Sequence, residues 1–140
     1  MTTVMGSDAE AVRRAIAALN QGIGTGLLRP MLEKHFDPEF EYFPPPGVPE
    51  PGPYRGYDEF ETFLRFFTNQ FEQVQITLED VIETGGQVTY RQSTQVKGGR
   101  SGALIADNSF CVATVRNDRL LRVVEDYDRA DALRRAGHDS

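Results

Sequence analysis

Apolar and polar residues alternate with a period of two along much of the second half of the chain, and this pattern predicts β-strands. Residues 101–127 read as two long strands joined by a tight turn, and they carry the β-branched and apolar side chains that half-buried strands favour. Residues 73–83 and 87–97 alternate in the same way, and a short strand is expected at 39–43. Together these segments predict a largely antiparallel sheet.

Apolar residues at helical spacing predict four helices. The clearest covers residues 57–71, where phenylalanine and leucine side chains recur on one face. Further helices are expected from Ser7 to about Asn20, over 27–35, and over 128–136, where Asp128 provides the N-cap. Residues 44–56 hold six of the eight prolines, so they predict a surface loop rather than a helix or a central strand.

The order of these elements is helix, helix, strand, helix, four strands, helix. It predicts an α+β fold in which helices cover the concave face of a curved, mostly antiparallel sheet. Neither a repeat nor a linker divides the chain, so residues 1–140 are expected to form a single domain.

Composition narrows the functional classes. The net charge is −6 and the basic residues are scattered, which argues against nucleic acid as a partner. No apolar run approaches the roughly 20 residues of a membrane helix, and the first residues lack the layout of a secretory signal. The single cysteine, Cys111, fits a cytoplasmic location. His35, His138 and Cys111 lie far apart in the sequence, so we expect neither a metal site nor a cofactor.

Several short motifs, in this order and spacing, resemble the NTF2-like superfamily and within it the SnoaL-like group related to ketosteroid isomerase. They cover nearly the whole chain: FDPEFEYFPP, PYRGYDEFETFL, GGQVTYRQ, GGRSG, VRNDRLLRVVEDYDR and ADALRRAG. The resemblance implies a cone-shaped NTF2-like fold with an apolar pocket into which polar groups project from the strands. It also implies a homodimer formed through the outer face of the sheet.

The catalytic sets known in this superfamily are only partly matched. Where ketosteroid isomerase has its base, this chain has Phe43 or Pro44, and Cys111 falls near the position of the oxyanion-stabilising acid, so steroid isomerisation is not supported. The resemblance to limonene-epoxide-hydrolase-like members matches Glu125 to the carboxylate of the last strand and Arg91 to the arginine, within one residue. Tyr42 stands in for the tyrosine of that set. The second carboxylate is replaced by Ser93 or Thr94, and His35 is the one candidate for the histidine of the SnoaL cyclases.

Alternation and resemblance together aim Glu125 into the pocket. Val123, Glu125 and Tyr127 share one face of the last strand. We therefore expect Glu125 as the base, with Arg91 or Tyr42 stabilising charge. The substrate-binding residues are expected to be Tyr127, Cys111, Ser93, Phe63, Phe67 and Phe40. In the alternative interpretation, Glu125 forms an ion pair with Arg91 or Arg122 on the sheet.

The inward face of residues 87–97 remains open. If Thr89 points inward, so do Arg91 and Ser93, whereas a slip of one residue sends Tyr90, Gln92 and Thr94 inward instead.

Two functions follow from the sequence. One is an isomerase, cyclase or hydrolase that acts on a hydrophobic compound by acid/base catalysis. The other is a non-catalytic ligand-binding or dimerisation module.

Overall fold

The structure is a computed structural model that describes residues 7–47, 52–98 and 104–137. These residues form four helices and six strands. The helices are α1 (Ser7–Gly22), α2 (Leu28–His35), α3 (Gly56–Thr68) and α4 (Arg129–Arg135). The strands are β1 (Phe36–Phe43), β2 (Tyr54–Arg55), β3 (Gln73–Thr84), β4 (Gln87–Lys97), β5 (Leu104–Arg116) and β6 (Arg119–Asp126).

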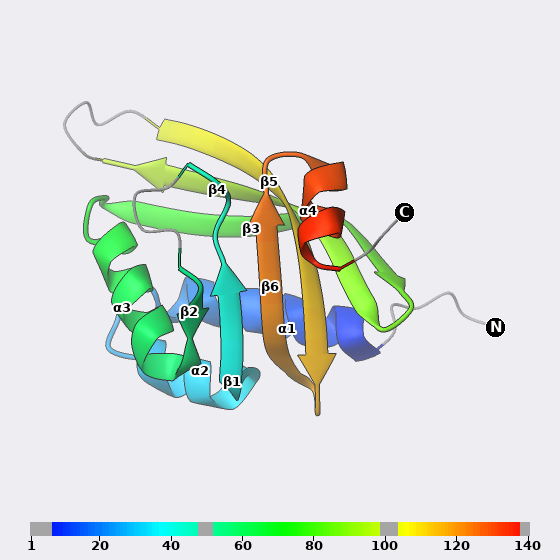
Figure 1. Cartoon of the computed structure of the whole chain (residues 1–140). Helices are drawn as coiled ribbons and strands as arrows, with labels where there is room; N and C mark the ends of the chain where they lie inside the picture. Colours follow the sequence, from blue (N-terminus) through cyan, green and yellow to red (C-terminus); the bar gives the residue numbers. More distant parts are fainter. Residues whose placement is uncertain (1–6, 48–51, 99–103, 138–140) are drawn as a thin grey trace.

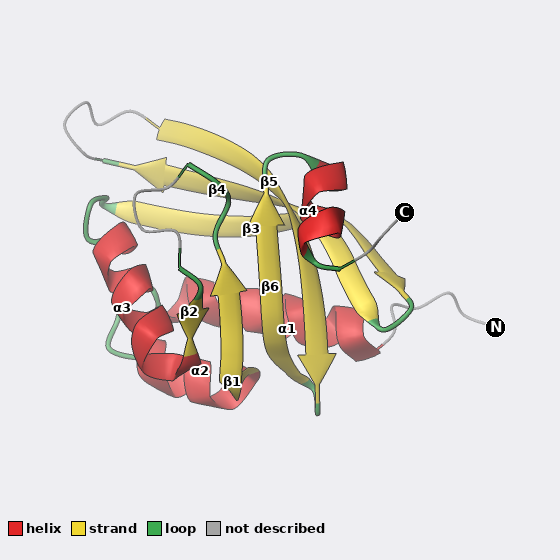
Figure 2. Ribbon diagram, in the orientation of Figure 1, coloured by secondary structure: helices red, strands yellow, loops and turns green. Residues whose placement is uncertain are grey.

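The strands form one sheet in the order β2-β1-β6-β5-β4-β3 (Figure 2). Neighbouring strands run antiparallel except for β1 and β6, which are parallel and lie near the middle of the sheet. The turn between β5 and β6 places Asn117 and Asp118 at φ of 53° and 61°, the left-handed conformation that a tight two-residue hairpin turn requires.

Helices lie on both faces of the sheet (Figure 1). On one face α1 buries Val12, Ile16 and Leu19 in a core that also contains Leu120 of β6. On the opposite face α4 buries Ala132, and its C-cap residue Ala136 is buried in the same cluster with Val112 and Val124. The expected α+β architecture with a mostly antiparallel sheet is confirmed, and the structure adds that its last helix covers the outer face.

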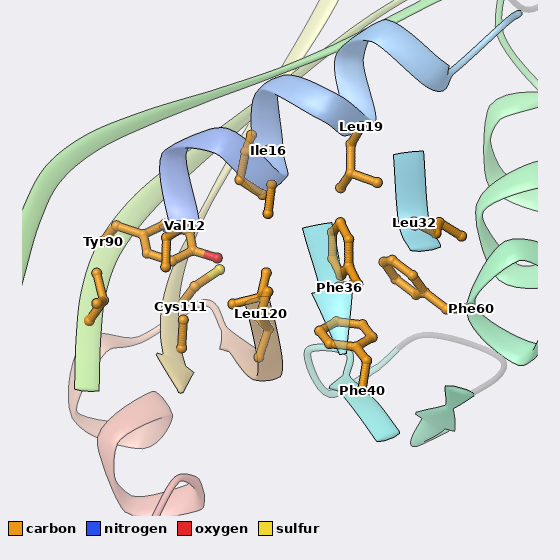
Figure 3. Close-up of a cluster of buried hydrophobic side chains, with 14 of the residues drawn as sticks. Val12, Ile16, Leu19, Leu32, Phe36, Phe40, Phe60, Tyr90, Cys111 and Leu120 are labelled. Atoms are coloured by element: carbon orange, nitrogen blue, oxygen red, sulfur yellow. The ribbon is translucent and has the colours of Figure 1, made fainter. Parts of the chain in front are cut away.

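The aromatic face predicted for 57–71 belongs to α3, which ends at Thr68, so the predicted helix is three residues too long at its C-terminal end. Its residues Phe60 and Leu64 are each 5% exposed, while Phe66 on the other side of the helix is 68% exposed. Phe60 packs against Phe36 and Phe40 of β1, with ring centroids 5.6 and 4.8 Å apart, and all three side chains are seen in Figure 3. Burying a phenylalanine side chain stabilises a fold by about 1.5–3 kcal/mol, so this contact fixes α3 against the sheet.

The first strand is longer than the expected 39–43, because it begins at Phe36 and includes Pro38. Proline cannot donate a ladder hydrogen bond, and the pairing of β1 with β6 shifts register between Phe36 and Glu41, which accommodates it. The proline-rich loop contains the two-residue strand β2, which the sequence did not predict. Residue 99 of the expected turn and residues 101–103 of the expected hairpin lie outside the described residues.

Within the described ranges, no helix is both long enough and apolar enough to cross a membrane. The same residues contain no group of three or more His, Cys, Asp or Glu side chains placed to hold a metal ion.

Candidate functional site

A cavity of about 420 Å³ lies between the sheet and the helices α1 and α3. Its helical wall is apolar and includes Ile16 and Leu19 of α1 and the phenylalanines of α3. Its polar lining side chains come mainly from the strands. Those from the strands are Tyr42 of β1, Tyr90, Gln92 and Thr94 of β4, and Glu125 of β6, and Thr68 and Tyr127 complete the polar lining. The cavity is within the size range of small-molecule sites, which are mostly apolar with a few placed polar groups.

Glu125 is the buried carboxylate of this cavity, and it is 9% exposed. The Tyr42 hydroxyl donates a hydrogen bond to its Oε1 at 2.5 Å, and the Ser109 hydroxyl donates to its Oε2 at 2.6 Å. Strand pairing brings these groups together, because Tyr42 pairs with Val123 on β6 and Glu125 pairs with Cys111 on β5. The carboxylate therefore has both oxygens oriented by hydroxyl donors from two neighbouring strands.

The surroundings of Tyr42 keep its hydroxyl protonated, so that it acts as a hydrogen-bond donor. Burial raises the pKa of Tyr42 well above its usual value, and the nearby carboxylate of Glu125 raises it further. The phenol therefore keeps its proton at neutral pH. Its ring packs against Phe60 and Phe63 of α3, with centroids 5.6 and 5.3 Å away, which fixes the direction of the hydroxyl.

Tyr90, Cys111 and Glu125 form a row across three adjacent strands, because Tyr90 pairs with Cys111 and Cys111 pairs with Glu125. Burial raises the pKa of both the Tyr90 phenol and the Cys111 thiol well above their usual values. Cys111 is therefore a neutral thiol rather than a nucleophile, and its Sγ lies 3.9 Å from Gln92 Oε1.

Arg135 of α4 supports the site from the outer face of the sheet. Its Nη1 donates to the main-chain oxygen of Glu125 at 2.6 Å and to Asp126 Oδ2 at 3.1 Å. Its Nη2 donates to the main-chain oxygen of Pro44 at 3.0 Å. A single guanidinium thus links the ends of β1 and β6, the two strands that carry Tyr42 and Glu125.

The expectation that Arg91 and Ser93 point into the pocket is wrong. On β4 the residues that line the cavity are Tyr90, Gln92 and Thr94, so the alternative register is the correct one. Arg91 lies on the outer face, where its Nη2 is 3.2 Å from Glu79 Oε1 and 3.5 Å from Asp80 Oδ2. The physical reason is the pairing of Tyr90 with Cys111, which sets the inward phase of the strand and turns its odd-numbered residues outward.

The alternative interpretation pairs Glu125 with Arg91 or Arg122, and both arginines have contacts elsewhere. Arg91 forms its ion pairs with the carboxylates on β3. The Arg122 guanidinium carbon lies 4.8 Å from the ring centroid of Phe43. Glu125 instead faces the cavity beside Tyr42, as the alternation predicted.

The remaining predicted residues divide into two groups. Four of them line the cavity: Phe40, Phe63, Phe67 and Tyr127. Cys111 belongs to the same face of the sheet but is 1% exposed and lies in the core beneath the cavity, so it does not line it.

Sequence reasoning missed Ser109 as a partner of the carboxylate. A signal was present, because a residue two positions before an inward-facing Cys111 must also face inward on a regular strand. For β4, the signal for the correct inward face was its three apolar residues Val88, Tyr90 and Val96. In the structure they are 0%, 3% and 7% exposed.

Known structures share this fold at low sequence identity. An NTF2-like protein of unknown function from Burkholderia pseudomallei matches with a TM-score of 0.72 and 19% identity, over 93% of this chain and 97% of that chain. TerC, co-crystallized with polyporic acid, matches with a TM-score of 0.72 and 16% identity, over 90% of this chain and 95% of its own. IdmH from Streptomyces antibioticus, a candidate polyketide cyclase, matches with a TM-score of 0.71 and 17% identity, over 94% and 99%.

Sequence comparison reaches the same group of proteins. No curated protein sequence matches the chain significantly. A family model described as the SnoaL-like domain matches residues 12–123, which is most of the chain. Together with the NTF2-like architecture of the similar structures, this match confirms the resemblance seen in the sequence motifs. The chain belongs to the SnoaL-like domain family.

Proposed function

We propose that the protein binds an apolar small molecule in the cavity and acts on it by acid/base catalysis without a cofactor. The observation that carries this proposal is the Glu125 carboxylate, 9% exposed in the wall of an otherwise apolar cavity and oriented by two hydroxyl groups. A carboxylate in such surroundings is a suitable general base. The similar structures of IdmH, a candidate polyketide cyclase, and of TerC with polyporic acid support a ligand of this kind.

In the proposed reaction Glu125 removes a proton from an acidic C–H or O–H of the substrate. The electron pair stays on the substrate as an enolate or alkoxide, which then isomerises, closes a ring or opens a strained bond. The proton returns from Glu125 to the product. Tyr42 and Ser109 keep the carboxylate in place throughout, since both donate to it. Arg91 has no part in this scheme, because it lies on the other face of the sheet.

The test uses 5-nitrobenzisoxazole, a flat and neutral probe that ring-opens when a base removes its C–H proton and the N–O bond breaks. The coloured phenolate product reports the rate directly. We expect the wild-type protein to accelerate ring opening and Glu125→Gln to lose most of that acceleration. Glu79→Gln is the matched control, because Glu79 is also a strand carboxylate but its side chain is 53% exposed and lies outside the cavity. Equal rates in all three proteins would refute the catalytic proposal.

A second candidate is a binding module without catalysis. It is favoured by the same two hydrogen bonds, because both carboxylate oxygens of Glu125 already accept from hydroxyl groups of the protein. This candidate predicts that native mass spectrometry of the purified protein detects a bound apolar compound while the probe reaction stays at its background rate.

We further propose that the protein forms a homodimer through the outer face of the sheet in a cytoplasmic setting. Helix α4 packs on β5 and β6, and the outward side chains of β4 next to them include Arg91, Ser93 and Gln95. An interface built on β3 and β4 would therefore be polar rather than apolar. Light scattering after size-exclusion chromatography tests it, and a monomer at micromolar concentration would contradict it. The proposed cytoplasmic setting rests on the single cysteine. Cys111 is a free thiol that is buried in the structure.

A further inference from the structure

The Tyr90 hydroxyl is a buried polar group that the proposed chemistry does not use. The residue is 3% exposed and its side chain lines the cavity, yet its hydroxyl has no hydrogen-bond partner among the described residues. Buried hydroxyl groups are normally paired, because leaving one unpaired costs free energy. An exception of this kind beside a cavity calls for an explanation.

The Cys111 thiol is a polar neighbour of the Tyr90 hydroxyl and, besides burial, contributes to its raised pKa, but it is a weak hydrogen-bond partner. Figure 3 shows the Tyr90 oxygen directed toward the sulfur of Cys111. A thiol sulfur is a weak acceptor, and Cys111 Sγ also lies within 3.9 Å of Gln92 Oε1, toward which its own hydrogen can point. Burial keeps the Tyr90 pKa well above its usual value, so the group remains an O–H donor at neutral pH. The Tyr90 hydroxyl therefore lacks a strong hydrogen-bond acceptor.

The charge of the cavity restricts what can supply that acceptor. Among the described residues that line the cavity, Glu125 carries the sole formal charge, and none is Arg, Lys or His. An anionic ligand would therefore bring its charge close to a buried carboxylate with no cation in the wall, which is unfavourable at low effective dielectric. A neutral oxygen, such as that of a ketone, carries no such penalty.

The sheet fixes where the donor stands relative to the base. Tyr90 and Glu125 lie on either side of Cys111 in the same cross-strand row. Neighbouring strands are about 4.8 Å apart, so the two Cα atoms are separated by about 10 Å. A flat molecule of one or two rings can therefore touch both residues while its faces contact the phenylalanines of α3.

We propose that Tyr90 is a ligand-binding residue, and that the cavity takes an uncharged compound that brings a carbonyl oxygen to the Tyr90 hydroxyl. The inference rests on the proposed function only in requiring that the cavity binds an apolar compound. The Tyr90 oxygen is covered by neighbouring side chains while the ring lines the cavity, so binding turns the side chain until the O–H faces the ligand. Tyr90 thus selects among apolar ligands and Glu125 rejects acids.

The test compares three naphthalene probes of similar shape. 2-Acetylnaphthalene carries a carbonyl oxygen, 2-isopropenylnaphthalene replaces that oxygen by carbon, and 2-naphthoate is an anion. The chain contains no tryptophan, so naphthalene fluorescence reports binding with little protein background. Dissociation constants are measured for the wild type, for Tyr90→Phe and for Tyr57→Phe, and that of 2-naphthoate also for Glu125→Gln. Tyr57 is a suitable control because its hydroxyl donates to the Phe36 oxygen at 2.8 Å and the residue does not line the cavity.

The expected result is a change in a ratio. The ratio is the dissociation constant of 2-isopropenylnaphthalene divided by that of 2-acetylnaphthalene. It should be about 3- to 10-fold larger in the wild type and in Tyr57→Phe than in Tyr90→Phe, which is the effect of one hydrogen bond. 2-Naphthoate should bind more weakly than the ketone in the wild type and should gain affinity in Glu125→Gln. Tyr90→Phe should melt at or above the wild-type temperature, because the substitution removes an unpaired hydroxyl.

Three results would overturn the inference. If Tyr90→Phe keeps the wild-type ratio, the hydroxyl does not bind the ligand, while the proposed apolar site survives. If 2-naphthoate binds as tightly as the ketone, the charge argument fails. If none of the three probes binds to the wild type, the proposed ligand site fails and the inference fails with it.

Discussion

Replacing Tyr42 by phenylalanine removes one hydroxyl from the candidate site and little else. The ring remains, so its packing against Tyr54, Phe60 and Phe63 is kept. What is lost is the hydrogen bond from the Tyr42 hydroxyl to Glu125 Oε1. Glu125 keeps its bond from Ser109 but is left with an oxygen that has lost a donor inside the protein.

The size of the effect follows from the charge of the acceptor. A hydrogen bond to an ionised group contributes about 1.5–3 kcal/mol, whereas one between neutral groups contributes about 0.5–1.5 kcal/mol. Tyr57→Phe provides the neutral comparison, because the Tyr57 hydroxyl donates to the main-chain oxygen of Phe36. We expect Tyr42→Phe to lower the free energy of unfolding by about 2 kcal/mol and Tyr57→Phe by about 1 kcal/mol.

Urea denaturation followed by far-UV circular dichroism measures both values, provided that the m-value stays the same in the three proteins. For a chain of 140 residues, a loss of about 2 kcal/mol corresponds to a fall in Tm of about 6–10 °C. If Tyr42→Phe costs no more than Tyr57→Phe at neutral pH, then Glu125 is not a charged acceptor for Tyr42. The description of the site as an oriented carboxylate would then be refuted.

Three further predictions concern other parts of the molecule. Arg91→Ala should lower stability by less than about 1 kcal/mol, since its ion pairs are exposed, and should leave the affinity for 2-acetylnaphthalene unchanged. A loss of binding there would restore Arg91 to the site. The Arg116 guanidinium lowers the pKa of Asp37, so this pair stabilises the fold above the ordinary aspartate pKa and the contribution is lost as pH falls through the lowered value. Wild-type stability should therefore drop below about pH 4 more steeply than that of Asp37→Asn, and parallel acid titrations would contradict this. Asp128→Ala removes the N-cap bond to the Ala130 N–H and should cost about 1 kcal/mol by thermal denaturation. An unchanged Tm would mean that α4 does not depend on its cap.

The sequence sufficed for the architecture because each element carries its own local signal. The phenylalanines of α3 repeat at helical spacing, and Asp128 occupies the position that an N-cap requires. Glu125 was predicted to face inward because alternation places it on one face with Val123 and Tyr127 and because the resemblance aims that face at the pocket, and all three residues line the cavity.

The same reasoning failed on β4, where polar residues stand on both faces. Arg91 and Ser93 on one side and Gln92 and Thr94 on the other give little contrast in hydropathy. The correct phase is indicated only by the apolar residues Val88, Tyr90 and Val96. The choice is made by hydrogen-bond register with β5, which is a long-range property. Ser109 was missed for a related reason. A serine in a strand becomes significant only when the carboxylate opposite it is known.

The parallel pairing of β1 and β6 has a consequence for how the protein folds. Tyr42 and Glu125 are in contact although they lie 83 positions apart in the sequence. The chain between them contains the four remaining strands of the sheet, β2 to β5. Contacts between such distant segments require closure of a long loop and form slowly compared with hairpins. We therefore expect the β3–β4 and β5–β6 hairpins to form first and the joining of β1 to β6 to be the slow step. The cavity wall that holds the base would then be completed last during folding.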